Sequence, residues 1–288
     1  MTMRGPIMRF FLNEDINFLV TNRLPRRFAT KLVGRIARIE HPLVARPSLA
    51  LWKFFAGVDL SDARTTRFKS LRDGFVRALR DGAREFDADP DSIASPCDAL
   101  VGAHGRIEDD RLYQVKGFPY RLGDLIPDAA LVERYRDGSF VTLRLTAGMY
   151  HRFHAPADLV VEGVTYVSGD CWNVNPIALK RVERLFCRNE RAVIEARVLM
   201  SGQPMLIVPV AAILVASIRL HCLDTERTLR EHGPGRTACS ARIGKGEEMG
   251  WFEHGSTIIL FLPKGMRLSD TLVEGQAIRA GAVIGHVG

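Results

Sequence analysis

Three short segments of the chain carry residue types that could do chemistry. The first, YHRFHAP over residues 150–156, places His151 and His154 three positions apart in a chain with eight histidines. Imidazole titrates near neutral pH, so these side chains are suited to proton transfer. The same spacing could bind a metal, but no other Cys/His cluster completes a coordination sphere, so we expect no metal site. One buried structural histidine and one exposed histidine would explain the segment equally well.

The other two segments offer a carboxylate and a hydroxyl. Asp98 follows a Ser-Pro turn in SPCD, where an aspartate most often serves only the turn. Ser256 stands between Gly255 and Thr257 and opens an apolar run, STIILFL. No GxSxG elbow is present, so a lipase-type nucleophile is not indicated. Taken singly, each segment is weak evidence for a catalytic site.

The first 85 or so residues are predicted to be helical. An apolar ridge and a cationic ridge run side by side there, which suits a helix lying among lipid headgroups. A surface helix packed on its own domain fits too, and the pattern alone favours that simpler interpretation. The apolar ridge is Leu24, Phe28, Leu32 and Ile36, and the cationic ridge is Arg23, Arg27, Lys31 and Arg35. A second apolar cluster, which adds to the lipid interpretation, is Leu49, Leu51, Trp52, Phe54 and Phe55.

Helical spacing continues briefly, and the rest of the chain is predicted to be β-rich. The positions 68, 71, 75 and 79 are apolar and predict a core-facing helix. From about residue 90, β-branched runs alternate with turn residues. The uncharged stretch from Val198 to Ile218 is long enough to cross a bilayer, but its glycine and prolines favour two buried strands joined by a turn at 201–204. We therefore expect an α+β fold, with N-terminal amphipathic helices on a mostly β body that has barrel-sandwich-like elements.

Charge and cysteine usage narrow the function classes. The chain of 288 residues has a formal net charge of +7, and its first fifty residues hold nine Lys/Arg against three Asp/Glu. A basic end on a near-neutral body argues against a nucleic-acid groove spread over the protein and suggests an anionic surface. The five cysteines are scattered and odd in number, which fits free thiols in a reducing compartment. No signal peptide is apparent, because Glu14 and Asp15 interrupt the N-terminal apolar residues.

Taken together and in order, these segments resemble the phosphatidylserine decarboxylase family of the bacterial membrane-associated type. The similarity covers most of the chain, and the separations of YHRFHAP, RNER and KGEEMG-x-F-x-x-GST are highly specific. The matching segments lie at 68–91, 95–101, 140–176, 185–195, 208–218 and 245–265.

The resemblance implies a self-cleaving precursor whose covalent pyruvoyl group forms from its own serine. Ser256 would become that group after scission of the Gly255–Ser256 bond, with Asp98 and His154 completing a self-processing triad. His151 matches a nearby site histidine. The implied enzyme converts phosphatidylserine to phosphatidylethanolamine and CO₂ through a Schiff base. It would need no external cofactor.

The resemblance also implies an organisation and a location. Residues 1–85 would form a helical membrane-associating region, and residues 86–288 the β-rich catalytic domain. The two cleavage fragments would stay together as a heterodimer, which would pair into a homodimer. We expect a peripheral protein on the cytoplasmic face of the cell membrane, bound to anionic lipid, with no nucleic-acid partner.

Two departures from the family pattern keep an alternative open. Ala99 follows Asp98 where the family usually has glycine, and His254 precedes Gly255 where it commonly has leucine. Neither change removes a reacting atom. They are the only support for a non-maturing barrel-sandwich relative that binds lipid or a partner. A basic nucleic-acid-binding module is a third hypothesis, for which the sequence offers no motif.

Overall fold

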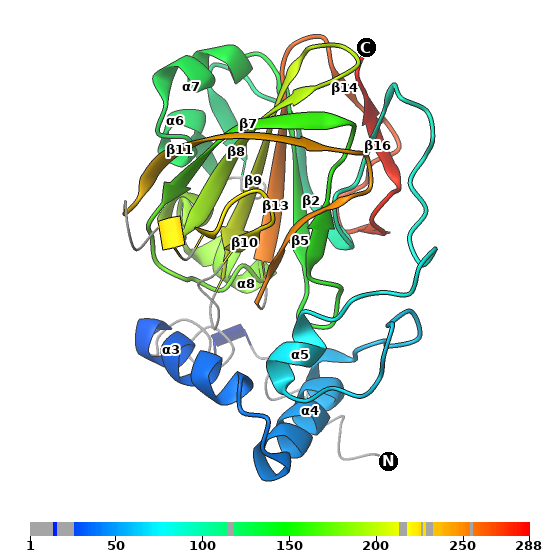
Figure 1. Cartoon of the computed structure of the whole chain (residues 1–288). Helices are drawn as coiled ribbons and strands as arrows, with labels where there is room; N and C mark the ends of the chain where they lie inside the picture. Colours follow the sequence, from blue (N-terminus) through cyan, green and yellow to red (C-terminus); the bar gives the residue numbers. More distant parts are fainter. Residues whose placement is uncertain are drawn as a thin grey trace.

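The largest element is a twisted antiparallel sheet of eight strands (Figure 1). The computed structural model describes residues 14–15, 26–113, 118–212, 218–225, 227–228, 233–253 and 256–288. The α+β prediction is confirmed, and the sheet is open, with β11 and β15 as its edges. Its strands run in the order β11 (Gly235–Ile243), β7 (Leu159–Val167), β8 (Arg191–Val198), β9 (Pro204–Ala211), β13 (Ser256–Leu262), β5 (Ser139–Leu145), β2 (Ala99–Arg106) and β15 (Ala277–Ile278).

Three smaller sheets complete the β structure of the described residues. One of them packs on a face of the large sheet, where the rings of Phe153 and Phe252 lie 5.3 Å apart in the shared core. That sheet is β10 (Ile218–Leu220), β12 (Glu248–Phe252) and β6 (Arg152–His154). The second is β1 (Ser92–Ala94), β16 (Val283–His286) and β14 (Arg267–Leu268), and the third is β3 (Arg111–Tyr113) with β4 (Pro119–Arg121).

Short helices cover the opposite face of the large sheet and enclose a second core. Strand β13 lies between the two cores, and all seven of its residues are buried. Ile258 and Leu260 enter one core while Ile259 and Phe261 enter the other, as the two-residue period of a strand requires. The covering helices are α6 (Leu122–Leu125), α7 (Ala129–Tyr135), α8 (Pro176–Arg181) and α9 (Leu185–Arg188).

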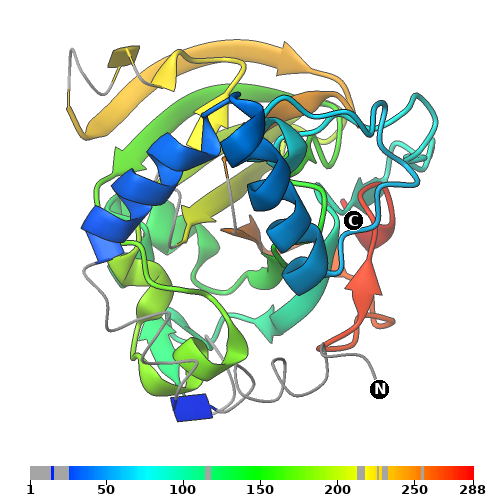
Figure 2. The same ribbon diagram turned by 90° about the horizontal axis from the view of Figure 1, so that it is seen from below.

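The N-terminal helices α3 (Arg26–Ala37), α4 (Pro42–Ala56) and α5 (Leu71–Phe75) lie together at one end of the sheets (Figure 1). Figure 2, viewed from that end, shows α3 and α4 crossing in front of the strands. His41 caps the start of α4, and Gly57 ends it in the left-handed region at φ 60°. Of the predicted apolar ridge, Leu24 lies outside the described residues and Leu32 and Ile36 are exposed.

Two sequence predictions, one of a helix and one of a turn between strands, can be compared with this structure. The core-facing helix predicted over positions 68–79 is wrong in extent, because α5 starts after its cap Ser70 and ends at Phe75. Leu79 instead bridges to Ala63, a pairing that local spacing cannot reveal. The turn predicted inside 198–218 is confirmed between β8 and β9, although residues 213–217 lie outside the described part. No described helix has the length and apolar character to span a membrane.

Candidate active site

Ser256 is the first residue of β13, between β5 and β9. Its strand partners are Leu145 on one side and Ala211 on the other, so its backbone is held from both sides. The residue is fully buried, and its Oγ has no hydrogen-bond partner within the described part of the chain. A buried hydroxyl without a partner costs about 1–3 kcal/mol in stability. His254 and Gly255, the residues before it, lie outside the described residues.

His154 lies in β6 and has a defined tautomer. Its Nδ1 is 2.9 Å from the carbonyl oxygen of Gly246, which can only accept, so Nδ1 carries the proton. Its Nε2 is 3.0 Å from the hydroxyl of Tyr150, which then donates to it. Burial lowers the pKa of His154 below 6.5, outweighing the hydrogen bond to Gly246 and the charges of Glu248 and Asp98. The imidazole is therefore neutral at physiological pH, with its lone pair on Nε2.

Asp98 precedes β2 and is gripped by one arginine. The Nε of Arg84 donates to its Oδ1 at 2.7 Å, and Nη2 of Arg84 donates to its Oδ2. The backbone N–H of Ala280 also donates to Oδ1, at 2.9 Å. Arg84 reaches Asp62 as well, at 2.8 Å. The carboxylate of Asp98 is therefore fixed in place, with both of its oxygens accepting hydrogen bonds.

Asp98 and His154 line two neighbouring cavities. A cavity of about 350 Å³ includes His154 in its lining, and one of about 420 Å³ includes Asp98. Arg84 and Tyr150 line both. A backbone hydrogen bond of 2.8 Å from the N–H of His154 to Pro96 ties the two segments together.

The three residues of the implied triad are not joined directly. Among the described residues, no hydrogen bond or ion pair links the side chains of Asp98, His154 and Ser256. Both ring nitrogens of His154 bond elsewhere, and the carboxylate of Asp98 is occupied by Arg84 and Ala280. Their roles remain proposals.

His151 is fully buried beside the strand that leads to the serine. Its Nδ1 is 2.9 Å from the carbonyl oxygen of Met149, and its ring centroid is 4.5 Å from that of Phe75 in α5. Its own carbonyl accepts from the N–H of Phe252 at 2.9 Å. The two histidines of YHRFHAP therefore occupy different surroundings, one against the N-terminal helices and one against a cavity.

Sequence reasoning missed the partners that hold these side chains. Tyr150 and Gly246 stand inside the motifs, but nothing in their types marks them as partners of His154. Arg84 stands in the similar segment 68–91, and Glu253 stands two positions before Gly255. The acidic residue inside WFEHGST was the one signal that could have singled out Glu253. In the described residues, no set of three His, Cys, Asp or Glu side chains is arranged to hold a metal ion.

Comparison with known proteins agrees with the resemblance. The family model described as phosphatidylserine decarboxylase matches residues 71–286. A phosphatidylserine decarboxylase proenzyme of Erwinia tasmaniensis is 34% identical over 283 residues, which cover 94% of each chain. The proenzyme of Halorhodospira halophila is 36% identical over 273 residues, covering 92% of this chain and 91% of that one. One from Acinetobacter baumannii is 32% identical over 282 residues, covering 96% and 97%.

Proposed function

The chain belongs to the phosphatidylserine decarboxylase family, and we propose that it is made as a proenzyme that cuts itself between Gly255 and Ser256 and then decarboxylates phosphatidylserine. The name proenzyme on its relatives supports processing into two chains. The observation that carries the proposal is the buried hydroxyl of Ser256, which has no hydrogen-bond partner among the described residues and lies at the start of a central strand.

The residues present fit a pyruvoyl group at position 256. Ser256 is enclosed, its backbone is fixed by two neighbouring strands, and its Oγ accepts or donates no hydrogen bond within the described part of the chain. Once formed there, the group would supply a ketone that captures the substrate amine and draws electrons away as carbon dioxide leaves.

In the proposed self-cleavage, Oγ of Ser256 attacks the carbonyl carbon of Gly255. The C–N bond breaks, the hydroxyl proton moves to the freed amine, and an ester joins the two residues. Loss of the Cα proton of Ser256 then expels the Gly255 carboxylate. One water molecule releases ammonia and leaves the keto group. The products are a chain ending at 255 and a chain beginning at 256.

We assign the proton transfers to His154. Its Nε2 bears the lone pair, and burial keeps the ring neutral and ready to accept a proton. The charge of Asp98 raises the pKa of His154 against the larger effect of burial, so Asp98 would stabilise the imidazolium that forms. During decarboxylation a proton must replace the lost carboxylate, and Nε2 of His154 would deliver it. His151, buried beside β12, is a further residue of the proposed site.

A peripheral membrane location is part of this proposal. The exposed large apolar side chains around α3 and α4 are Leu32, Ile36, Ile39, Leu43, Leu51, Phe54 and Phe55. Single exposed apolar residues are ordinary, but so many on two adjacent helices favour contact with lipid. Cationic side chains among them would favour an anionic leaflet at the cytoplasmic face. A division near residue 85 into membrane region and catalytic body, and a homodimer of the cut heterodimer, complete the proposal.

The intact mass of the purified full-length chain tests this function. We expect two fragments, the smaller starting at residue 256 with its serine amine lost as ammonia. Ser256→Ala should give one uncut chain that releases no carbon dioxide from phosphatidylserine. Ser201→Ala, in the exposed turn between β8 and β9, is the matched control and should be cut normally. A wild-type chain that stays whole and keeps its serine would instead favour the non-maturing relative.

A further inference from the structure

A buried carboxylate marks the start of the connection that ends at Ser256. Glu253 directly follows β12, and its side chain is 8% exposed. Arg72 donates to its Oε1 from Nε at 3.1 Å and from Nη2 at 2.7 Å. Arg38 donates from Nη2 to Oε2 at 2.9 Å, and Nε of Arg219 lies 3.6 Å from Oε1. We call Glu253 with these three arginines the Glu253 clamp.

The charges in the clamp are strongly coupled. Burial alone would raise the pKa of Glu253, but hydrogen bonds from Arg72 and Arg38 outweigh it and lower the pKa to about 2. The carboxylate is therefore ionised at every pH at which the protein works. Removing its charge would take away the carboxylate to which both Arg38 and Arg72 donate, so the clamp depends on the Glu253 side chain.

The three arginines come from three separate parts of the fold. Arg38 lies just after α3, Arg72 lies in α5, and Arg219 lies in β10. Arg38 and Arg72 are 215 and 181 positions away from Glu253 in the sequence. The clamp therefore fastens the N-terminal helices to the end of β12, at the end of the sheets where Figures 1 and 2 place those helices.

The position of the clamp matters because self-cleavage depends on alignment. Ser256 is fixed by its strand partners Leu145 and Ala211, and Glu253 fixes the chain on the other side of residues 254–255. The bond to be cut lies between these two anchors. A reacting pair displaced by about 1 Å can lose about 100-fold in rate. An anchor two residues before that bond can therefore affect the alignment of the reacting atoms and so the rate of cleavage.

We propose that Glu253 is a positioning residue for maturation. Its clamp holds the chain at the end of β12, two residues before the bond to be cut, and it makes cleavage depend on the packing of α3 and α5 against the sheets. The inference rests on the proposed self-cleavage and adds a residue to it.

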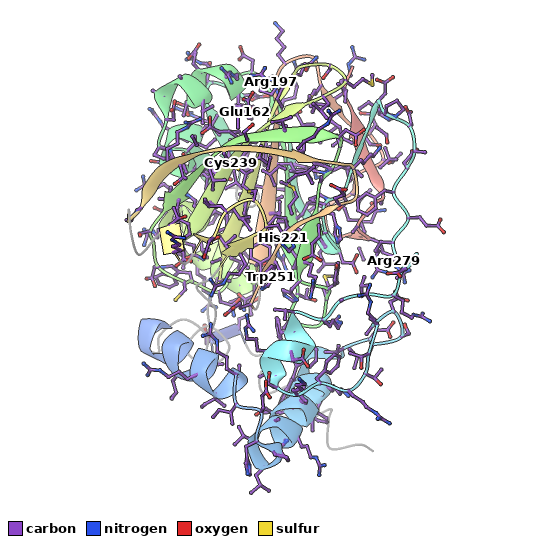
Figure 3. The ribbon with its side chains drawn as sticks, in the orientation of Figure 1. Glu162, Arg197, His221, Cys239, Trp251 and Arg279 are labelled. Carbon is purple, nitrogen blue, oxygen red and sulfur yellow. The ribbon has the colours of Figure 1, made fainter. Side chains whose placement is uncertain are left out.

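The test follows the appearance of the two fragments after synthesis of the full-length chain, by denaturing electrophoresis and intact mass. We expect Glu253→Gln to slow cleavage by about 10- to 100-fold. Glu253→Asp keeps the charge and should recover part of the rate. The matched control is Glu162→Gln, which breaks an exposed two-bond pair with Arg197 at the opposite end of the molecule (Figure 3). It should be cut at the wild-type rate.

A double substitution separates positioning from simple loss of stability. Arg72→Ala should also slow cleavage, and Glu253→Gln with Arg72→Ala should be no slower than the worse single variant, because both break one contact. Thermal unfolding of Ser256→Ala with and without Glu253→Gln reports any loss of fold separately. Equal midpoints with unequal cleavage rates would support positioning.

The outcomes distinguish this inference from the function on which it rests. Normal cleavage of the wild type with equal cleavage of Glu253→Gln overturns the inference alone. Additive slowing by Glu253→Gln and Arg72→Ala, with no recovery in Glu253→Asp, also overturns it. A wild-type chain that is never cut overturns the proposed function, and the inference with it.

Discussion

The tautomer of His154 is set by two neighbours, Gly246 and Tyr150, that could not be identified as its partners from the sequence. A carbonyl oxygen fixes the proton on Nδ1, and the Tyr150 hydroxyl points its own proton at Nε2. Burial favours the neutral ring and so lowers its pKa. In the proposed mechanism this residue would act as a base although no carboxylate bonds to its ring. The charge of Asp98 raises the pKa of His154 without a hydrogen bond between the two side chains.

The lowered pKa gives a pH prediction for maturation. Protonation at Nε2 would consume the lone pair, so cleavage should slow as pH falls, with the acid limb below the ordinary pH 6.5 of a histidine. Above that limb the rate should be flat towards about pH 8. The measurement is the rate of fragment formation against pH. His104→Gln, on β2, should keep the same profile, and an acid limb above pH 7 would rule out His154 as the base.

The Asp98–Arg84 pair gives a stability prediction. Both side chains are nearly buried, at 12% and 10% exposed, so Arg84→Ala leaves a carboxylate without its counter-charge. In the uncut Ser256→Ala background we expect a loss of about 3 kcal/mol in the free energy of unfolding by urea. Arg64→Ala breaks an exposed pair with Asp81 and should cost less than about 1 kcal/mol. Equal losses would show that burial does not set the strength of the first pair.

At the level of single residues, the sequence pointed to the proposed reacting groups but not to the residues that hold them. Asp98, His154 and Ser256 came from motif resemblance, since each type alone has a common structural explanation. Arg84, Tyr150 and Gly246 were not predicted, because a hydrogen bond between distant positions depends on the fold and leaves no local pattern. Glu253 was visible in its motif but had no meaning until Arg38 and Arg72 were placed beside it.

Among the elements, strand β12 carries the chain to the proposed cleavage site and packs with little clearance. A Cβ on Gly250 would come within 2.0 Å of the carbonyl oxygen of Arg219 and 3.1 Å of the Phe153 ring. Gly250 therefore allows β10 and β12 to pair closely while β6 flanks the other side.

A substitution at Gly250 tests that close approach. Gly250→Ala should force β12 away from β10, cost about 1–3 kcal/mol in the free energy of unfolding and slow fragment formation. Gly34→Ala, in α3 with nothing within 4 Å of the new Cβ, is the matched control and should stabilise its helix by up to about 1 kcal/mol. Urea unfolding and the cleavage time course measure both effects. Unchanged cleavage in Gly250→Ala would show that the close approach of β10 and β12 is not needed for cleavage.

Two elements show where sequence patterns lose their power. Pro209 lies in β9, a central strand, although proline is normally confined to sheet edges. On the side of β8, the strand pairs are Arg191↔Val210 and then Ile194↔Ile207. Pro209 lies between these pairs and has no partner in β8, so the ladder there does not require its missing N–H. Helix α5 ended early because Leu79 found a strand-like partner, Ala63. In both cases a non-local pairing overrode a local preference.

For the whole molecule, the α+β class and the start of the β-rich part near residue 90 followed from periodicity, although the last helix before it, α5, already ends at Phe75. The strand order did not, since it joins β11 to β7 and β13 to both β9 and β5 across long stretches of sequence. The apolar ridge of the first helix was the hardest pattern to interpret. The side chains of Leu32 and Ile36 are 44% and 38% exposed, and this exposure is what our proposal of lipid contact rests on.

Membrane attachment gives a prediction at this scale. Leu43 and Leu51 are 81% and 60% exposed, and changing both to Glu should weaken binding to anionic phospholipid vesicles by about tenfold or more, from lost apolar contact and added repulsion. Vesicle sedimentation measures the bound fraction. Met200 and Val273 are also exposed but belong to the β8–β9 and β14–β15 connections, outside these helices, so the same double change there should leave binding intact. Equal weakening by both pairs would argue against a lipid-facing end.

The place of β13 in the middle of the large sheet has a consequence for the cut protein. The small fragment would begin with that strand and also supply β14, β15 and β16, so its backbone is interleaved with the large fragment in two sheets. The contact between the two fragments would therefore lie in the interior, where β13 pairs with β5 and β9. The two fragments should therefore not dissociate on dilution unless the protein is denatured. The cleaved protein should unfold thermally in a single transition, as an uncut chain would.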